Sequence, residues 1–393
     1  MHIGIHVNTL PTTSFIERLA TGLKDRGFKV TIFGTSVRAH SKIQNVNYAT
    51  FKLHSSFNLS KTIFYLKYAL LLALFKPKLK RKLDQKLHEL GELNLHNKTR
   101  FYPILWLKPD VLHIQWIKGI QQYLWVREFG IKLVGSLRGT HIYMNPVLDN
   151  AIASSYRLAL PRLDGAHAVC QNISDEALKY GLLRKKVQVI YSGIDINQLQ
   201  FIKPSQKKRR EEPVMKIISV GRSNWIKGYT YALDAISRLQ KNNIKVHYSI
   251  AGGGQSEEIL YQVSDLELDE IVTIIPWQSF EEIKNLIQEA DILLLPSISE
   301  GIANAAIEAM ALGTLVIATN VGGMEELIIH KSNGYLIPSR SVDSIVEAIH
   351  WAGSLSTNAK DELAEYARNT VEERFNLDSM ILNYESFYRK VVA

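Results

Sequence analysis

Hydrophobic and polar positions follow two alternating periods along this chain, which predicts strands and helices in turn. Residues 2–7 alternate apolar and polar side chains, and residues 15–27 repeat apolar positions at helical spacing up to a glycine. A second strand pattern occupies residues 29–34, which completes a β–α–β unit. The same order continues with buried-strand patterns over 108–116, 131–139, 166–172 and 186–195.

The pattern is interrupted once, at residues 201–213, and then restarts. That segment reads FIKPSQKKRREEP, which is polar, charged and contains proline, so we interpret it as a linker between two domains. Strand patterns resume over 215–222, 245–254, 270–277, 291–297, 314–320 and 333–339, with helical patterns between them. Strands and helices that alternate in both halves predict an α/β protein with two doubly wound parallel sheets, one in residues 1–200 and one in residues 214–371.

Composition narrows the class of protein. The chain has 393 residues, of which 46% are hydrophobic and 22% charged, so a disordered or fibrous protein is excluded. The single cysteine, Cys170, excludes a disulfide framework and a cysteine metal cage, and suits a reducing compartment. The first residues lack a basic segment followed by a long apolar one, so we expect no secretion signal and a cytoplasmic location.

Charge is divided unevenly between the two halves. The formal net charge is +9, made of +16 in residues 1–200 and −7 in residues 201–393. Two halves of opposite sign suggest two domains with different partners, the first of them facing an anionic one.

The most apolar stretch, residues 63–75, is followed directly by a basic one. A thirteen-residue helix is about 20 Å long, too short for the roughly 30 Å hydrocarbon core of a membrane. Six cations follow between residues 76 and 86, with leucines at helical spacing. We therefore expect residues 61–90 to lie on an anionic membrane surface, at the inner face of the membrane. The alternative is a buried helix followed by a solvated basic one; a nucleic-acid patch is disfavoured because no nucleic-acid motif follows.

Candidate chemistry gathers in loops after the predicted strands of the second half, where doubly wound sheets bind ligands. Glu300 and Gly301 follow one strand, and a helix of small residues then carries Glu308. The start of that helix, with Ile302, Ala303 and Asn304, offers free backbone N–H groups to an anion. Glu308 is placed to bind a diol such as ribose, and Glu300 to reach a sugar; two ordinary surface glutamates are the alternative.

Two cations and several glycines follow other strands of the same half. Arg222 and Lys227 can hold the two phosphates of a nucleotide diphosphate, unless they are merely solvent-facing. The glycines Gly252 to Gly254, and the pair Gly322 and Gly323, permit close approach of a ligand to the backbone. A dinucleotide fingerprint would need glycine where Glu257 stands, so a dehydrogenase is disfavoured.

Together these segments resemble the retaining glycosyltransferases of family 4. The matching stretches are 220–228 (VGRSNWIKG), 250–254, 290–323 and 334–345, and Glu300 and Glu308 match the family's pair of glutamates separated by seven residues. The resemblance implies the GT-B fold, in which two Rossmann-like domains face each other across a cleft. Residues 1–200 would form the acceptor side, residues 214–371 would bind the nucleotide sugar, and a helix at 372–393 would pack back on the first domain.

The resemblance also implies roles for individual residues. Arg222 and Lys227 would hold the diphosphate, Glu308 the ribose, and Glu300 the donor sugar near the reacting carbon. Backbone amides at Gly301 to Asn304 would complete the phosphate site, with Gly252, Gly254 and Gly322 lining the donor.

The first half departs from the family in two places. Arg138 stands where members often have a histidine that approaches the donor sugar, and His141 follows three residues later; either could take that role, with a structural role open for His141. A glycine pair near the amino terminus is absent, so acceptor contacts there are expected from Asn8, Thr12 and Thr13. His113 and Trp116 follow another strand and are further acceptor-side candidates, with core packing as the alternative.

The expected function is transfer of a sugar from a UDP-, GDP- or similar nucleotide sugar to a lipid-linked or polysaccharide acceptor, with retained anomeric configuration. No metal or other cofactor is expected, because no DxD triplet follows a strand and cations can neutralise the phosphates. No nucleic-acid partner is expected either. The alternatives are an epimerase or phosphorylase of the same fold, or a catalytically silent scaffold.

Overall fold

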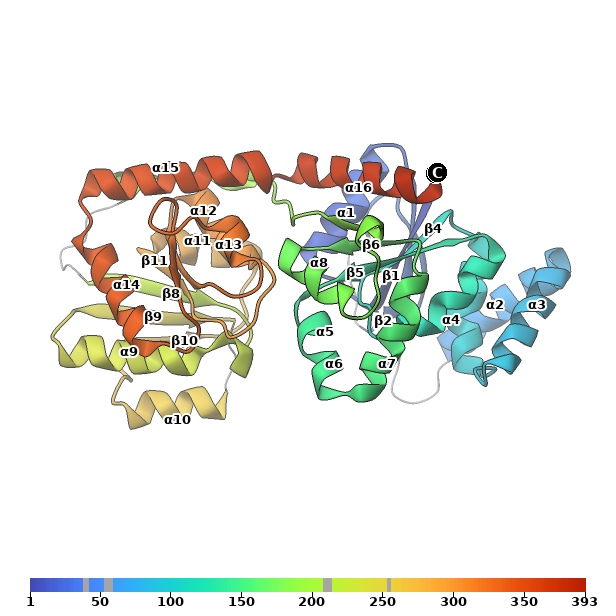
Figure 1. The fold of residues 1–393 in the computed structure, drawn as a ribbon, viewed down its shortest axis with the longest axis horizontal. Coiled ribbons are helices and arrows are strands. Elements are labelled where there is room, and N and C mark those ends of the chain that lie inside the picture. Colours follow the sequence, from blue (N-terminus) through green and yellow to red (C-terminus); the bar gives the residue numbers. More distant parts are fainter. Residues whose placement is uncertain (38–41, 53–58, 208–213, 253–255) are drawn as a thin grey trace. The chain divides into compact units, whose positions relative to one another are not determined.

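The computed structural model describes residues 1–37, 42–52, 59–207, 214–252 and 256–393, which form two compact units (Figure 1). The first unit comprises Met1–Val169, Ile173–Ile190 and Ile381–Ala393, and the second comprises Cys170–Asn172 and Tyr191–Met380. Each unit contains one parallel sheet with helices packed around it. The expected α/β class, with one parallel sheet of the Rossmann-like kind in each unit, is therefore confirmed.

The sheet of the first unit has seven parallel strands in the order β3-β2-β1-β4-β5-β6-β7. Its order reverses between β1 and β4, and such a reversal is where open α/β sheets bind ligands. The strands are β1 His2–Leu10, β2 Lys29–Ser36, β3 Asn47–Lys52, β4 Val111–Ile114, β5 Lys132–Leu137, β6 Gly165–Ala168 and β7 Val187–Val189. The helices of this unit are α1 Ser14–Asp25, α2 Leu59–Phe75, α3 Pro77–Glu89, α4 Leu95–Leu107, α5 Gly139–Tyr143, α6 Asn145–Leu148 and α7 Asn150–Ala159, with most of α8 Gln171–Leu178 and of α16 Leu377–Val392.

The sheet of the second unit has six parallel strands in the order β10-β9-β8-β11-β12-β13, and its order reverses between β8 and β11. The strands are β8 Met215–Val220, β9 Val246–Ala251, β10 Val272–Ile275, β11 Ile292–Leu295, β12 Leu315–Thr319 and β13 Tyr335–Ile337. The helices are α9 Tyr229–Lys241, α10 Glu257–Asp265, α11 Phe280–Glu289, α12 Asn304–Leu312, α13 Met324–Leu327, α14 Val342–Ser354 and α15 Thr357–Arg374.

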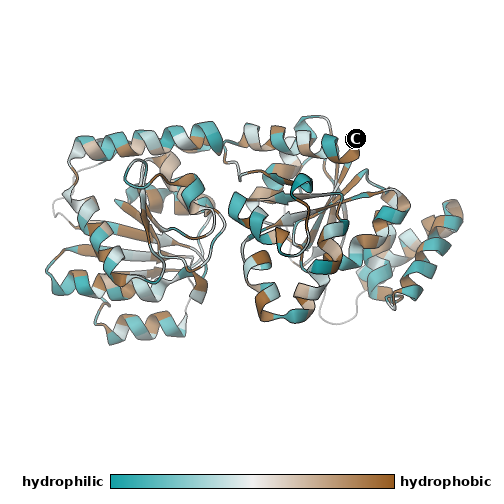
Figure 2. Cartoon of the chain, in the orientation of Figure 1, coloured by the Kyte–Doolittle hydropathy of each residue, from teal (hydrophilic) through white to brown (hydrophobic). Residues whose placement is uncertain are grey.

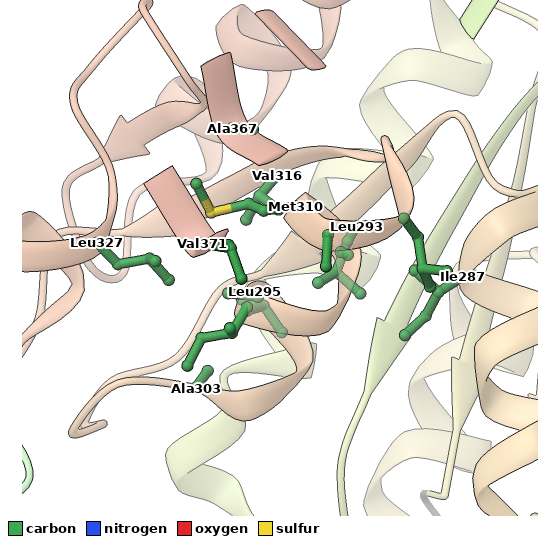
Figure 3. Packing of buried hydrophobic residues seen from close by; sticks show 14 of the residues in the cluster. Ile287, Leu293, Leu295, Ala303, Met310, Val316, Leu327, Ala367 and Val371 are labelled. Carbon is green, nitrogen blue, oxygen red and sulfur yellow. The ribbon is translucent and has the colours of Figure 1, made fainter. Parts of the chain in front are cut away.

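The central strands are hydrophobic along their length because helices cover both faces of each sheet (Figure 2). In the second unit, Leu293 of β11 and Val316 of β12 pack with Met310 of α12 (Figure 3). Ala367 and Val371 of α15 belong to the same cluster. This cluster fixes α12 against the strands, and α12 carries one of the two glutamates singled out in the sequence.

The boundaries between the units differ from those expected. The chain enters the second unit at Tyr191 and leaves it after Met380, whereas the sequence placed these crossings at 201–213 and 371–372. The reason is packing: Ile194 and Leu199, which precede the expected linker, are buried in the same core cluster as Phe375. Residues 201–207 consequently lie within the second unit, and 208–213 lie outside the described residues.

Helix α2 presents an apolar stripe to solvent. Its side chains at 59, 63, 66, 70 and 74 recur at helical spacing, and each is more than half exposed: Leu59, Ile63, Leu66, Leu70 and Leu74. Tyr68 and Leu72 are the residues of this helix that are buried. The alternative of a buried helix over residues 63–75 is therefore wrong. No helix in the described part of the chain is both long and apolar enough to cross a membrane.

Candidate functional site

The loops after β8 and β11 meet at the point where strand order reverses in the second unit. The backbone N–H of Ile298 donates to the carbonyl of Ile226 at 2.7 Å, which joins the two loops. The hydroxyl of Tyr229 donates to the carbonyl of Gly221 at 3.0 Å and fixes the start of the first loop. Burial raises the pKa of Tyr229, and the nearby Glu300 carboxylate raises it further.

One ion pair links the side chains of these loops. Lys227, at the end of a short 3-10 turn, donates its Nζ to Oε1 of Glu300, and both side chains are about one-fifth exposed. The turn begins at Asn224, whose side chain accepts from the N–H of Ile226 at 3.1 Å. Arg222 lies on the same loop and is exposed. The structure thus places the predicted cations Arg222 and Lys227 on one loop and brings Lys227 to the predicted carboxylate Glu300.

Close backbone approach holds the loops in place, at two glycines with positive φ. Gly228 has φ +67, and a Cβ there would lie 2.1 Å from the carbonyl oxygen of Pro296. Gly322 has φ +62, and a Cβ there would lie 1.9 Å from the carbonyl oxygen of Glu300. Only glycine satisfies both the backbone angle and the contact. Gly322 therefore supports the backbone that carries Glu300.

The other glycines predicted for this site are placed as follows. Gly252 follows β9 and lies against Gly221, since a Cβ on Gly252 would be 3.5 Å from the Gly221 carbonyl. Gly301 is buried and its carbonyl accepts from the N–H of Gly323 at 2.8 Å. Gly254 lies outside the described residues.

Helix α12 begins four residues after Glu300, and no side chain among the described residues caps it. Its N-cap residue is Ala303, which has no side chain to cap the helix, while the Ala303 carbonyl accepts from Ala306 and Ile307. The N–H groups of the first turn, at Asn304 among them, are thus available to an anion, as in many phosphate sites. Ile302 is half-buried just before the helix, and Glu308 lies one turn beyond Asn304 on the same face.

In the first unit, Arg138 follows β5 and rests on aromatic rings. Its guanidinium carbon lies 3.9 Å from the ring centre of Phe15 and 5.8 Å from that of Trp116, and Nη2 donates to Oε1 of Gln115 at 3.1 Å. The Nε of Arg138 is buried and, among the described residues, has no hydrogen-bond partner. No carboxylate in the described part of the chain pairs with this cation, and burial lowers its pKa.

The two histidines predicted in this unit have different surroundings. The ring of His141 lies 5.4 Å from that of Trp116, and burial lowers the pKa of His141, with Lys118 and Arg138 adding to the shift. His113 is fully buried, and its ring nitrogens are hydrogen-bonded to the hydroxyls of Tyr388 at 2.6 Å and Ser136 at 2.8 Å. His113 therefore takes part in a buried polar network rather than facing an acceptor.

The remaining acceptor-side candidates lie before α1 and near the end of β1. Thr12 and Thr13 precede α1, where Thr13 is the N-cap but makes no side-chain capping bond. Asn8 is exposed near the carboxyl end of β1 and lines a cavity with residues of α4. Thr13 is two residues before Phe15, whose ring contacts Arg138 and Trp116.

Sequence reasoning missed the residues that hold Arg138. Phe15 was visible only as an apolar position of α1, and Gln115 as part of a strand end. No sequence signal marks either one, because the contacts depend on how the carboxyl ends of β1, β4 and β5 converge. Among the described residues, no group of three His, Cys, Asp or Glu side chains gathers as metal ligands would.

Family models match nearly the whole chain. The model described as "Glycosyltransferase Family 4" matches residues 12–198, and that described as "Glycosyl transferases group 1" matches residues 200–370. The chain belongs to glycosyltransferase family 4.

Curated relatives of this family 4 chain agree with the assignment. A protein named as colanic acid biosynthesis glycosyltransferase WcaL of Escherichia coli (strain K12) is 28% identical over 66% of this chain and 65% of its own length. The amylovoran biosynthesis glycosyltransferase AmsK of Erwinia amylovora is 29% identical over 57% of each chain. The chain therefore spans between half and two thirds of the length of these relatives.

Solved structures share the fold over the full length of this family 4 chain. A glycosyltransferase from Rickettsia africae ESF-5 superposes with a TM-score of 0.71 at 20% identity, covering 100% of this chain and 98% of that one. Anabaena Alr3699/HepE, solved in complex with UDP, gives 0.72 at 17% identity and covers 99% of both. At these identities the similarity establishes the fold.

The close contact between Gly322 and the Glu300 carbonyl predicts that adding one methyl group at position 322 strongly destabilises the fold. Gly322→Ala should lower the free energy of unfolding by clearly more than the roughly 1–2 kcal/mol that positive φ alone imposes on a side chain, because the methyl group would overlap the Glu300 carbonyl. Gly27→Ala is the matched control, since Gly27 has φ +82 and open space around its Cβ position. Denaturant unfolding of both variants checks this, and equal losses would contradict it.

Proposed function

We propose that this chain transfers a sugar from a nucleotide diphosphate sugar to a hydroxyl group of a lipid-linked or polysaccharide acceptor, with retained anomeric configuration and without a metal. The observation that carries the proposal is the grouping of Lys227, Glu300 and the start of α12 where strand order reverses in the second unit. Relatives named for colanic acid and amylovoran biosynthesis support an acceptor of the cell-surface glycan type, and a structural neighbour that binds UDP supports the donor class.

In this mechanism the second unit stabilises the leaving group. As the bond between sugar and diphosphate breaks, negative charge grows on the β-phosphate. Lys227, Arg222 and the free N–H groups at Asn304 lie on loops that meet, so they can share that charge without reorganising. These groups supply the positive charge that a metal ion would otherwise provide, which supports metal independence.

The two glutamates have separate tasks in the proposal. Glu300 is held by Lys227 and reaches the sugar near its reacting carbon, while Glu308 binds the ribose from the next turn of α12. No carboxylate is assigned as a nucleophile, so the leaving phosphate would deprotonate the acceptor hydroxyl on the same face of the sugar. Transfer on that face retains the configuration.

The same donor site is compatible with other reactions. An epimerase would convert the nucleotide sugar without any acceptor, a phosphorylase would need inorganic phosphate, and a silent scaffold would turn over nothing. The pairing of Lys227 with Glu300 favours an enzyme, because an unused site has no need to hold both charges half-buried.

We further propose that α2 and α3 place the first unit on the inner, cytoplasmic face of the membrane. The exposed leucine stripe of α2 supplies apolar area, and α3 continues it with exposed Lys78, Arg81 and Lys82. Apolar area beside a cationic face is the combination that binds anionic bilayers.

Transfer itself is tested with a panel of UDP- and GDP-sugars and membrane extract as acceptor, in the presence of EDTA. We expect one donor to be consumed only when extract is present, with product in the donor's anomeric configuration. An inverted product, conversion of the donor alone, or an absolute need for Mn²⁺ would each refute the corresponding part of the proposal.

Removal of either partner of the ion pair should stop transfer. Glu300→Ala and Lys227→Met are expected to lower kcat roughly 10²- to 10³-fold, as loss of a group aimed at developing charge does in other enzymes. Lys241→Gln, an exposed cation at the end of α9, is the matched control and should leave the rate unchanged. Thermal melting shows whether the variants are folded, and normal rates in folded variants would refute the site.

Membrane attachment should depend on both helices. Replacing Lys78, Arg81 and Lys82 by Gln is expected to weaken binding to anionic vesicles roughly 100-fold, since each cation near the surface contributes about 1 kcal/mol. Leu70→Ser with Leu74→Ser should weaken it at constant charge, whereas Leu183→Ser, an exposed leucine elsewhere in the unit, should not. Vesicle flotation measures all three, and equal binding to neutral and anionic vesicles would contradict the proposal.

A further inference from the structure

A cavity of about 200 Å³ opens in the first unit beside the carboxyl ends of β1 and β2. Asn8 of β1 and Thr35 of β2 line it from the sheet, Phe64 lines it from α2, and His96 and Arg100 line it from α4. The cavity is smaller than the roughly 300–1,000 Å³ of pockets that enclose a whole drug-sized ligand, so it suits one group of a larger molecule.

Arg100 brings a positive charge to this cavity, and neutral side chains hold its guanidinium in place. Its Nη1 donates to Oε1 of Gln122 at 3.2 Å, its Nη2 donates to the hydroxyl of Tyr123, and the guanidinium lies over the Tyr123 ring at 5.3 Å. The Tyr123 hydroxyl is hydrogen-bonded in turn to Nε2 of His6 at 2.7 Å. Burial and Arg100 lower the pKa of His6 to about 3, so His6 is neutral at physiological pH. This chain of contacts fixes the guanidinium and leaves its charge uncompensated.

No carboxylate among the described residues pairs with that charge. Arg100 has no ion pair with any residue that the structure describes, and the segments of this unit outside the description, 38–41 and 53–58, contain neither Asp nor Glu. The neighbouring ionisable groups bring no negative charge: burial raises the pKa of the Tyr123 hydroxyl, and burial lowers the pKa of His96, with Arg100 and Lys61 lowering it further. A half-buried, fixed cation with only neutral and basic neighbours is stabilised when an anion binds.

Helix α2 connects this cavity to the apolar stripe described above. Phe64 faces the cavity, with its ring 5.5 Å from that of Phe51 on β3, while Ile63, Leu66 and Leu70 of the same helix are exposed. A molecule with an anionic head and a hydrocarbon chain fits this arrangement, because the head would reach Arg100 and the chain would lie along α2.

We propose that this cavity binds a phosphate group of the acceptor, with Arg100 as the residue that recognises it. The phosphate belongs either to a lipid or to a soluble sugar phosphate, and the continuity with α2 favours the lipid. The assignment to the acceptor rests on the proposed transferase function, whereas binding of a phosphate in the cavity does not.

The test measures binding of octyl phosphate to the full chain by titration calorimetry. Arg100→Gln is expected to weaken binding roughly 10- to 100-fold, as removal of charge-assisted hydrogen bonds does. Lys185→Gln removes an exposed cation from the same unit and should change nothing. Octyl glucoside, which has a neutral head, and octanoate, which has a carboxylate, should bind more weakly than octyl phosphate. Undiminished octyl phosphate binding by folded Arg100→Gln, or tighter binding of octanoate, would overturn the proposal.

A second variant and a second probe complete the test. Arg100→Lys keeps the charge but loses the forked donors, so it should show a smaller loss; unchanged binding would overturn the role of Arg100, and it covers the case in which Arg100→Gln fails to fold. Methyl phosphate separates the sources: binding weaker than that of octyl phosphate supports a lipid phosphate, and equal binding supports a soluble one. Donor turnover is measured separately, so absence of transfer would refute the proposed function and leave the phosphate result standing.

Discussion

The ion pair between Lys227 and Glu300 is the interaction on which the site of the second unit depends. It joins the loops after β8 and β11, the two strands between which the order of the sheet reverses. Neither charge is fully buried, so the pair adds only modestly to stability. Its importance is positional, because it fixes a cation and a carboxylate beside the first turn of α12. The close backbone contacts of Gly228 and Gly322 also fix the conformation of these loops, and so the positions of the side chains that the loops carry.

Much of this site could be predicted from the sequence because its residues are close together along the chain. Arg222 and Lys227 follow one strand, and Glu300, Asn304 and Glu308 follow another, so their order along the chain nearly determines their place in a parallel sheet. The boundary between the units could not be predicted in this way. The polar composition of 201–213 predicted a linker there. The boundary instead depends on the burial of Ile194 and Leu199 with Phe375, which joins segments far apart in the sequence.

In the first unit, local sequence patterns do not predict the contacts of His113 and Arg138. His113 looked like a residue at a strand end, yet it is buried against Tyr388, which lies in α16 at the opposite end of the chain. Phe15 and Gln115, which hold Arg138, come from α1 and from the end of β4. Each contact joins segments whose separation carries no periodic signal, so only the packed structure reveals it.

Two arginines of the first unit are held in fixed positions without a carboxylate partner among the described residues. Arg138 and Arg100 both rest on aromatic rings, both donate to neutral side chains, and neither has an ion pair among the described residues. Carboxylates elsewhere in this unit do pair with cations, as Asp84 does with Lys80 and Asp164 with Arg127, so the lack of a partner is local. A chain that folds with such cations unmatched gives up some stability, and an anionic ligand restores it on binding. The excess of +16 in residues 1–200 is thus not only a surface property: part of it is held, half-buried and oriented, on two arginines of the first unit.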